Sequence, residues 1–172
     1  MALDPESFDI LLAAVQRFVR ERLMPAENHL EEHDEVPPEL VEEMKDMGLF
    51  GLTVPEAYGG IGLSVSQEVQ VNFELGRTAS AFRSVFGTNI GIGSQGILMD
   101  GTPQQKAEFL PRVASGELVM SFALTEPDAG SDAASLKTRA EPQGDDHYVL
   151  NGTKRFITNA PRAGAYTLMA RT

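Results

Sequence analysis

The spacing of the apolar residues changes once along this chain, near residue 118, and this change limits the fold more than any other feature. Before it, apolar residues recur every three or four positions, as Leu11, Val15 and Phe18 do, which is typical of one face of a helix. After it, apolar residues come in short runs separated by Gly, Pro, Asn and Asp, which is typical of strands and turns. We therefore expect an α+β fold, with an N-terminal all-helical domain over residues 1–118 followed by the start of an antiparallel β domain over residues 119–172.

Local signals divide the helical part into segments. Asp4 and Pro5 suit the N-cap and the first position of a helix over residues 4–24, which can continue beyond Pro25. Gly48 is placed to end a second helix that begins at Pro37-Pro38, and the Gly- and Pro-rich residues after it are loop material. Three more helices are expected: residues 65–78, a buried helix over 80–100, and a short helix that begins after Thr102 and is ended by Pro111 and Gly116.

In the β part, the apolar run LVMSFALT predicts a buried strand over residues 118–125. Because Asn-Gly between two strand-like runs is the strongest short hairpin signal, we expect a hairpin centred on Asn151-Gly152. The last apolar run leaves a sheet edge uncovered, which native proteins normally block, so we expect the front part of a longer protein. The remaining strand-like runs cover residues 136–141, 147–150, 153–158 and 165–170, with a further turn signal at Gly144-Asp145-Asp146.

The composition excludes several classes of function. The chain has no Cys, so it holds no disulfide, no thiolate nucleophile and no Cys-ligated metal. Its net charge of -11 argues against binding to nucleic acid, which requires a basic face. No apolar run reaches the ~18–20 residues of a membrane span, and the acidic N-terminus lacks a targeting signal, so we expect a cytoplasmic protein. The first 50 residues carry 13 acidic and 4 basic side chains, which predicts a solvated acidic surface there.

Two patterns match known kinds of site only in part. His29 and His33 are four residues apart, but their neighbours are uniformly charged, so we expect a solvated helix end and no metal site. Residues 91–96 match the dinucleotide pattern G-x-G-x-x-G, which requires a preceding strand and an uninterrupted following helix. Pro103 and Pro111 argue against that helix, so close helix packing, or room for a ligand tail, explains these glycines better. A dinucleotide-binding protein stays open as an alternative.

Two further segments carry the strongest indications of a ligand. In FALTEPDAGSD (122–132), a strand runs into a Gly-Ser turn whose N–H groups and hydroxyls suit an anionic or hydrogen-bonding ligand. In a strand over residues 153–158, Phe156 and Thr158 project to the same face about 7 Å apart, so a ring and a hydroxyl could contact a flat heteroaromatic group. The alternatives are an ordinary hydrophilic turn in the first case, and a core Phe with a surface Thr in the second.

Together these segments resemble the acyl-CoA dehydrogenase flavoprotein family. ALTEPDAGSDAAS (123–135) fits the family's first signature at every constrained position, and NGTKRFITNA (151–160) is similar to its second flavin-contacting stretch. GLFGLTVPEAYGGIGLS (48–64) and DGTPQQKAEFLPRVASGE (100–117) resemble other recurrent stretches of these enzymes, so the likeness spans nearly the whole chain. The family's order of helices followed by strands also agrees with the change of periodicity.

The resemblance implies FAD as the cofactor and suggests which residues of the first segment hold it. Phe122, Leu124 and Thr125 would contact the flavin ring, while Gly130 and Ser131 would approach the pyrophosphate. Ser131 would also lie near the acyl-CoA substrate.

The second segment would complete the flavin site. By the same resemblance, Phe156 would pack against the isoalloxazine ring, and Thr158 would form a hydrogen bond near N5, the atom that accepts hydride. Much of the family has Trp where this chain has Phe156. The aromatic face is therefore kept, while the indole N–H donor is lost.

The activity that the resemblance implies is α,β-dehydrogenation of an acyl-CoA thioester, in which a carboxylate base takes the α-proton and FAD takes the β-hydride. In this family the base is a Glu on a C-terminal helical domain. No residue here matches it, and Glu126 belongs to the signature turn, so no catalytic residue is assigned and the 172 residues should be inactive alone. The implied partners are the acyl-CoA substrate, an electron-transfer flavoprotein and, at full length, further copies of the chain. The alternatives are an acyl-CoA oxidase of the same fold and a non-enzymatic interaction module.

Overall fold

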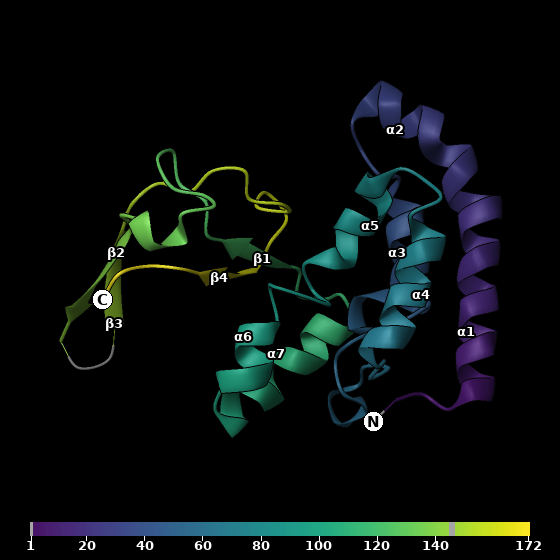
Figure 1. The fold of residues 1–172 in the computed structure, drawn as a ribbon, viewed down its shortest axis with the longest axis horizontal. Helices are drawn as coiled ribbons and strands as arrows, with labels where there is room; N and C mark the ends of the chain where they lie inside the picture. Colours follow the sequence, from purple (N-terminus) through teal and green to yellow (C-terminus); the bar gives the residue numbers. More distant parts are fainter. Residues whose placement is uncertain (1, 145–146) are drawn as a thin grey trace.

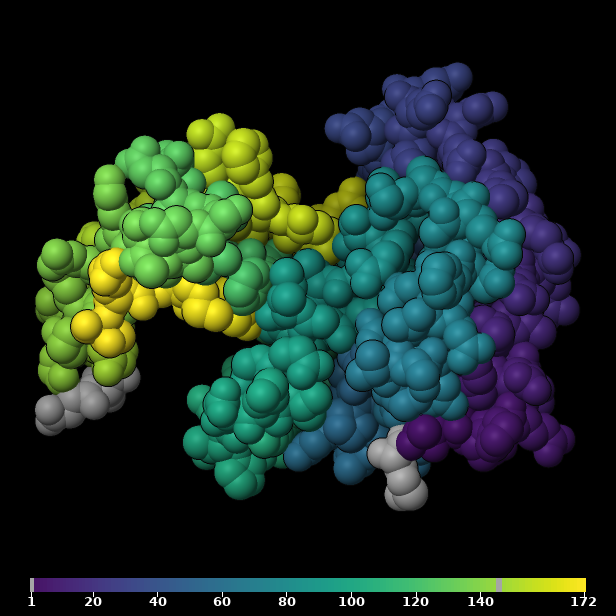
Figure 2. Space-filling model, viewed as in Figure 1, coloured from purple at the N-terminus to yellow at the C-terminus, as the bar shows by residue number. Residues whose placement is uncertain are grey.

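The computed structural model describes residues 2–144 and 147–172, and in it the helices are separated from the strands. Figure 1 shows α1 to α5 gathered at one side and the strands at the other, with α6 and α7 below and between them. The space-filling view in Figure 2 shows an open notch between the strand side and α6–α7. The predicted α+β order, helices followed by a small sheet, is confirmed. Within the described residues, none of the helices is long and apolar enough to cross a membrane.

The N-terminal helix is nearly continuous and changes type around Pro25. Helix α1 (Pro5–Phe18) begins after Asp4, whose side chain accepts the N–H of Ser7 at 3.0 Å. Pro25 has no N–H to donate to the preceding turn, which accounts for the irregular helix around it. The predicted continuation beyond Pro25 is confirmed. The segments that follow α1 are a π-helical η1 (Val19–Leu23), a 3-10 turn η2 (Met24–Ala26) and α2 (Glu27–His33).

Helices α3 (Pro38–Asp46) and α4 (Val65–Leu75) flank a loop that contains two 3-10 turns, η3 (Leu49–Gly51) and η4 (Glu56–Tyr58). Gly48 follows α3 with a φ of 73°, the left-handed conformation that ends many helices and that glycine adopts most readily. Ser64 and Gln67 form a reciprocal capping box at the start of α4. These elements agree with the sequence, although α4 ends at Leu75 rather than at residue 78.

The prediction of one buried helix over residues 80–100 is wrong. The structure has two short helices, α5 (Ser80–Gly87) and α6 (Gln95–Asp100), with turns between them. In these turns the backbone of Gly93 packs closely against Thr88 and Met120. A Cβ at this position would lie only 2.6 Å from the carbonyl oxygen of Thr88 and 2.8 Å from Cβ of Met120. Since a helix and not a strand precedes residues 91–96, the dinucleotide alternative is also wrong.

Helix α7 (Pro103–Ala114) opens with a capping box between Thr102 and Gln105, as the sequence predicts. Pro111 lies inside this helix and does not end it, which corrects the prediction. Its missing N–H costs one intrahelical hydrogen bond, and the helix runs on regardless. The chain leaves the helix at Gly116, which has a φ of 76°.

The strands form two separate two-stranded sheets. β1 (Met120–Ala123) pairs in parallel with β4 (Ala165–Leu168), and β2 (Arg139–Gln143) pairs antiparallel with β3 (His147–Asn151). The prediction of an antiparallel β domain therefore holds for β2–β3 and is wrong for β1–β4. For two strands to pair in parallel, the chain must return to the end of the sheet at which the first strand began. The long connection between β1 and β4 allows this return.

The hairpin predicted at Asn151-Gly152 is wrong. β3 ends at Asn151, and residues 152–164 form no strand. The predicted strand over residues 153–158 is excluded by the backbone of Phe156, whose φ of 58° is left-handed. The connection from β2 to β3 begins at Gly144, which has a φ of 72°, and the predicted turn residues Asp145-Asp146 lie outside the described residues.

Two clusters of buried apolar side chains make up the core. The larger cluster lies among the helices and includes Phe50, Phe82 and Phe86. The smaller cluster joins α7 to β1 and includes Leu110 and Met120. Of the side chains that the structure describes beyond residue 129, no hydrophobic one is buried. The core therefore supports β1 and leaves the rest of the β part at the surface.

Candidate functional site

A hollow of about 190 Å³ lies where the end of β1 meets the loop after β3 and the turns after α5. It contains five residues that the sequence suggests for a flavin: Phe122, Leu124, Thr125, Phe156 and Thr158. The structure brings these two segments together although they lie far apart in the chain. Its other lining residues are Thr88, Ile92 and Ile157.

β1 supplies one wall of the hollow through the alternation of its side chains. Ser121 and Ala123 are buried, whereas Phe122 is only half-buried and lines the hollow. The hydroxyl of Ser121 donates to the carbonyl oxygen of Thr158 at 2.6 Å, which ties β1 to the opposite wall. Ser121 and Ala123 therefore anchor the strand, and Phe122, next to the buried Met120 on the other face, is left for a ligand.

The loop after β3 supplies the opposite wall, without the strand that the sequence predicts. Phe156 is 80% exposed in spite of its size, and the guanidinium group of Arg155 lies 4.4 Å from the centre of its ring. Asn159, with a φ of 63°, donates to the carbonyl oxygen of Ser84 at 2.8 Å and to the hydroxyl of Thr88 at 2.9 Å. These bonds fix the loop against the end of α5, so the loop is held by side chains rather than by a sheet.

The two remaining predicted residues, Gly130 and Ser131, do not line this hollow. They follow a tight turn in which the N–H of Glu126 donates to the carbonyl oxygen of Ala129 at 2.7 Å. Ser131 is exposed, and the hydroxyl of the nearby Ser135 donates to Asp132. The turn continues directly from the wall that contains Leu124 and Thr125.

Glu126 is buried under this turn and is held as a carboxylate. Its oxygens accept the N–H groups of Lys137 at 2.6 Å and Thr138 at 2.9 Å, and they lie 2.9 Å from Nζ of Lys154. The Thr138 side chain, the Lys154 ammonium group and the two backbone N–H groups hold the pKa of Glu126 well below its usual range, because each favours the charged form over the neutral acid. Burial opposes this shift in the pKa without overcoming it.

Three lining residues were missed by the sequence predictions: Thr88, Ile92 and Ile157. Ile157 lies within the flavin-type stretch, between the predicted flavin contacts Phe156 and Thr158. Thr88 and Ile92 lie in the segment that the sequence places inside one helix, and only the break after α5 turns them toward the hollow. The signal in the sequence is the run of small residues at 91–96, which allows close packing or leaves room for a ligand tail.

Other groups of polar residues lie away from this hollow. His29 and His33 are exposed on α2, and their rings stack at 4.2 Å. In the described part of the chain, no group of three or more His, Cys, Asp or Glu side chains could hold a metal ion.

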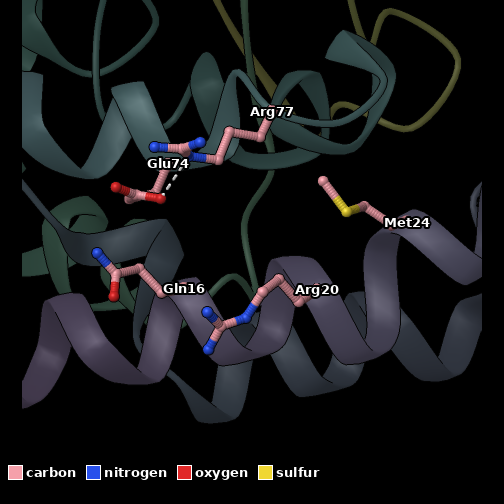
Figure 3. A pocket seen from close by; sticks show the side chains of 5 residues that line it. All are labelled: Gln16, Arg20, Met24, Glu74 and Arg77. Atoms are coloured by element: carbon pink, nitrogen blue, oxygen red, sulfur yellow. Dashed lines mark hydrogen bonds and ion pairs between the residues drawn. The ribbon is translucent and has the colours of Figure 1, made fainter.

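A larger hollow of about 380 Å³ lies between α1–η2 and the end of α4, where Arg77 donates to Glu74 at 2.7 Å (Figure 3). Its lining residues are Gln16, Arg20, Met24, Glu74 and Arg77.

Comparison with known families gives two matches that cover almost the whole chain. Residues 5–117 match the model of the acyl-CoA dehydrogenase N-terminal domain, and residues 121–172 match that of the acyl-CoA dehydrogenase middle domain.

Individual proteins agree with these matches. The chain is 43% identical to (2S)-methylsuccinyl-CoA dehydrogenase of Cereibacter sphaeroides over 97% of its own length and 30% of the relative. The acyl-CoA dehydrogenase of Bacillus anthracis complexed with FAD is 35% identical, with a TM-score of 0.85 over 98% of this chain and 30% of that one. A structure described as the electron transferring flavoprotein of Acidaminococcus fermentans is 32% identical, with a TM-score of 0.89 over 100% of this chain and 45% of that one.

The chain thus spans between 30% and 45% of the length of these relatives. The matched residues include both walls of the hollow and the buried Glu126–Lys154 pair. Given the two family matches and the shared fold, the chain belongs to the acyl-CoA dehydrogenase family.

Proposed function

We propose that this chain forms the N-terminal, flavin-contacting part of an FAD-dependent acyl-CoA dehydrogenase, which removes hydrogens from Cα and Cβ of an acyl-CoA thioester in fatty acid metabolism. The hollow between β1 and the loop after β3 carries the proposal, because it joins five residues suggested for FAD from the sequence alone. We also propose that the helical and β domains divide between residues 118 and 119.

The chemistry of the hollow suits a flat heteroaromatic ring. Phe156 offers an exposed aromatic face, and Phe122 and Leu124 add apolar surface. The hydroxyls of Thr125 and Thr158 add polar groups at the same place, and such a mixture is typical of cofactor sites. Gly130 and Ser131, on the turn beyond Thr125, would hold the pyrophosphate, and Ser131 would also approach the acyl-CoA.

When bound, FAD supplies the redox step by accepting a hydride. The residues of this chain orient and shield the flavin. The hydroxyl of Ser121 donates to the carbonyl oxygen of Thr158 at 2.6 Å, and Asn159 fixes the loop against α5, so these bonds would hold the Thr158 hydroxyl beside a bound ring. Phe122 and Leu124, which are half-buried in the lining, would shield one side of a bound ring from water.

The base that takes the α-proton is expected outside these residues. Glu126 lies close to the hollow in sequence, but it is buried and bound to Lys154 and to two backbone N–H groups. A carboxylate whose pKa is held so low has little tendency to accept a proton. We therefore assign no catalytic residue here and expect the base on a further helical domain.

The hollow can be tested by measuring FAD binding to purified variants. Phe156→Ala should weaken binding by about tenfold, since an aromatic contact contributes ~0.5–1.5 kcal/mol beyond the buried area. Phe73→Ala is the matched control, because Phe73 on α4 is 73% exposed and lies away from the hollow. Equal binding by both variants and the unchanged chain would show that the flavin site lies elsewhere.

Activity assays separate the proposal from its alternatives. The 172 residues should not oxidise an acyl-CoA with an artificial electron acceptor, and robust turnover would contradict the expected absence of a base. In a longer protein that contains this chain, oxygen consumption compared with dye reduction separates an oxidase from a dehydrogenase. The dehydrogenase would pass electrons to an electron-transfer flavoprotein and would act as a homo-oligomer. An interaction module would bind a partner chain and no FAD.

A further inference from the structure

Two buried charges lie beside the flavin hollow, one in each of the segments that line it. Nζ of Lys154 is 2.9 Å from Oε1 of Glu126, and the two side chains are only 10% and 5% exposed. Side chains of this kind are seldom buried, because they lose their hydration. Well-packed apolar side chains of similar size often stabilise a fold equally well, so stability alone does not explain an ion pair at this place.

Lys154 binds the backbone of the opposite segment as well as the carboxylate. Its ammonium group donates to the carbonyl oxygen of Leu124 at 2.9 Å. Next to it, the N–H of Arg155 donates to the carbonyl oxygen of Thr125 at 3.0 Å. Both acceptors belong to residues that line the hollow, and both donors directly precede Phe156 on the other wall. Directional bonds of this kind fix the spacing of the two segments, which apolar contacts do not.

Glu126 anchors the ammonium group to the turn. Its carboxylate accepts the N–H groups of Lys137 and Thr138, so its own position is set by the backbone and not by Lys154 alone. Charge-assisted bonds are shorter and stronger than neutral ones, and burial keeps water from competing for them. The carboxylate therefore presents a fixed acceptor to which Lys154 can be attached.

We propose that Glu126 and Lys154 are positioning residues of the flavin site, which hold the wall that carries Phe156 at a fixed spacing from the wall of Leu124 and Thr125. The role rests on the proposed function, since it concerns the same hollow. Neither residue of the pair lines the hollow, so the pair would act on FAD through the residues that do.

Lys154→Met tests this role through two measurements on the whole chain. Loss of the ammonium group should raise the dissociation constant for FAD by about tenfold, as expected when a hydrogen bond to a charged group is lost. The amide of Arg155 should exchange with deuterium about tenfold faster, because the two walls separate more often. Lys106→Met is the matched control, since Lys106 lies on α7 outside the lining of the hollow, where its ammonium group contacts the carbonyl oxygen of Met99 at 3.5 Å. Its FAD affinity and Arg155 exchange should stay unchanged.

The double variant Glu126→Gln with Lys154→Met separates positioning from plain stabilisation. It leaves no unpaired buried charge, so its urea midpoint should recover toward that of the unchanged chain relative to Lys154→Met. Positioning requires FAD binding and Arg155 exchange to remain impaired in spite of this recovery. Lys154→Arg keeps the charge and the donors, and it should retain more FAD affinity than Lys154→Met.

Two results would overturn the positioning role. One is a double variant whose FAD affinity recovers together with its stability. The other is a Lys154→Met chain whose FAD affinity and Arg155 exchange both equal those of the unchanged chain. If the unchanged chain binds no FAD, the proposed function fails, and the exchange of the Arg155 amide still decides whether the pair holds the two walls together.

Discussion

Phe156 has a backbone conformation that a large side chain rarely adopts. Its φ of 58° is left-handed, which costs roughly 1–3 kcal/mol for a residue other than Gly. The flanking residues impose it, since Lys154 and Asn159 on either side are bonded to distant backbone oxygens. Strain of this kind is typical of functional sites, and here it turns the ring out of the core and into the solvent beside the hollow.

At the same scale, the stability that Glu126 contributes should depend on pH. The surroundings hold the pKa of the folded-state carboxyl below its ordinary value of 4.5, so its contribution is complete above about pH 4.5 and is lost as the pH falls toward the folded-state pKa. Glu126→Gln should therefore lower the urea midpoint at pH 7, and its difference from the unchanged chain should shrink between pH 5 and pH 3. Glu117→Gln, at an exposed carboxylate, is the control. A difference that grows on acidification would contradict the proposed surroundings of Glu126.

At the scale of elements, Asn89 joins the helical part to the β part. Its side chain is fully buried, and its amide donates to the carbonyl oxygens of Val113 at 3.1 Å and Leu118 at 2.8 Å. Its carbonyl oxygen accepts the N–H of Met120 at 2.8 Å. One side chain thus connects the turn after α5, the end of α7 and the first residue of β1.

Asn89→Ala should destabilise the chain by about 2–4 kcal/mol, because it leaves the carbonyl group of Leu118 and the N–H of Met120 buried without partners. The free energy of unfolding in urea measures this loss. Asn28→Ala, at an exposed position of α2, should change the same quantity by less than about 0.5 kcal/mol. A similarly small effect at both positions would mean that Asn89 is not the link between the helices and β1.

Gly93, in the turns between α5 and α6, and Gly96, inside α6, should respond unequally to substitution. Gly93→Ala should destabilise by about 1–3 kcal/mol, because its new methyl group meets the Thr88 carbonyl and Met120. Gly96→Ala should stay within about 1 kcal/mol of the unchanged chain, since the nearest atom to a Cβ there is 3.7 Å away and Ala favours the helix. Thermal unfolding of the two variants compares them, and equal midpoints would contradict close packing at Gly93.

At the scale of the whole molecule, burial decreases along the chain. The helical part holds the larger apolar cluster, whereas β2–β3 exposes Tyr148, Val149 and Leu150. A two-stranded ribbon without a buried face is marginally stable in water. The acidic side chains are unevenly placed too, with 13 of the 25 in the first 50 residues, none of which lines the hollow.

This gradient should appear in hydrogen exchange. Amides of β2–β3 should exchange at least about 100-fold faster than those of Val71 and Leu75 in α4, because local opening of the ribbon costs far less than global unfolding. Exchange measured residue by residue by NMR tests this prediction. Equal protection in both regions would show that the chain unfolds as one cooperative unit.

The sequence alone determined the features that depend on local chemistry: the order of helices and strands, the caps at Asp4 and Thr102, and the family through its two signature stretches. It failed where distant contacts override local preference. Asn151-Gly152 signals a hairpin, yet the chain leaves β3 there, because Asn159 and Lys154 bind carbonyl groups near α5 and β1 and hold the loop away from a ladder. Only the tertiary structure decided that β4 pairs in parallel with β1 and that the turns after α5 carry Thr88 and Ile92 to the hollow. It also decided that Glu126 forms an ion pair with Lys154. Each of these arrangements depends on contacts between residues that are far apart in the chain.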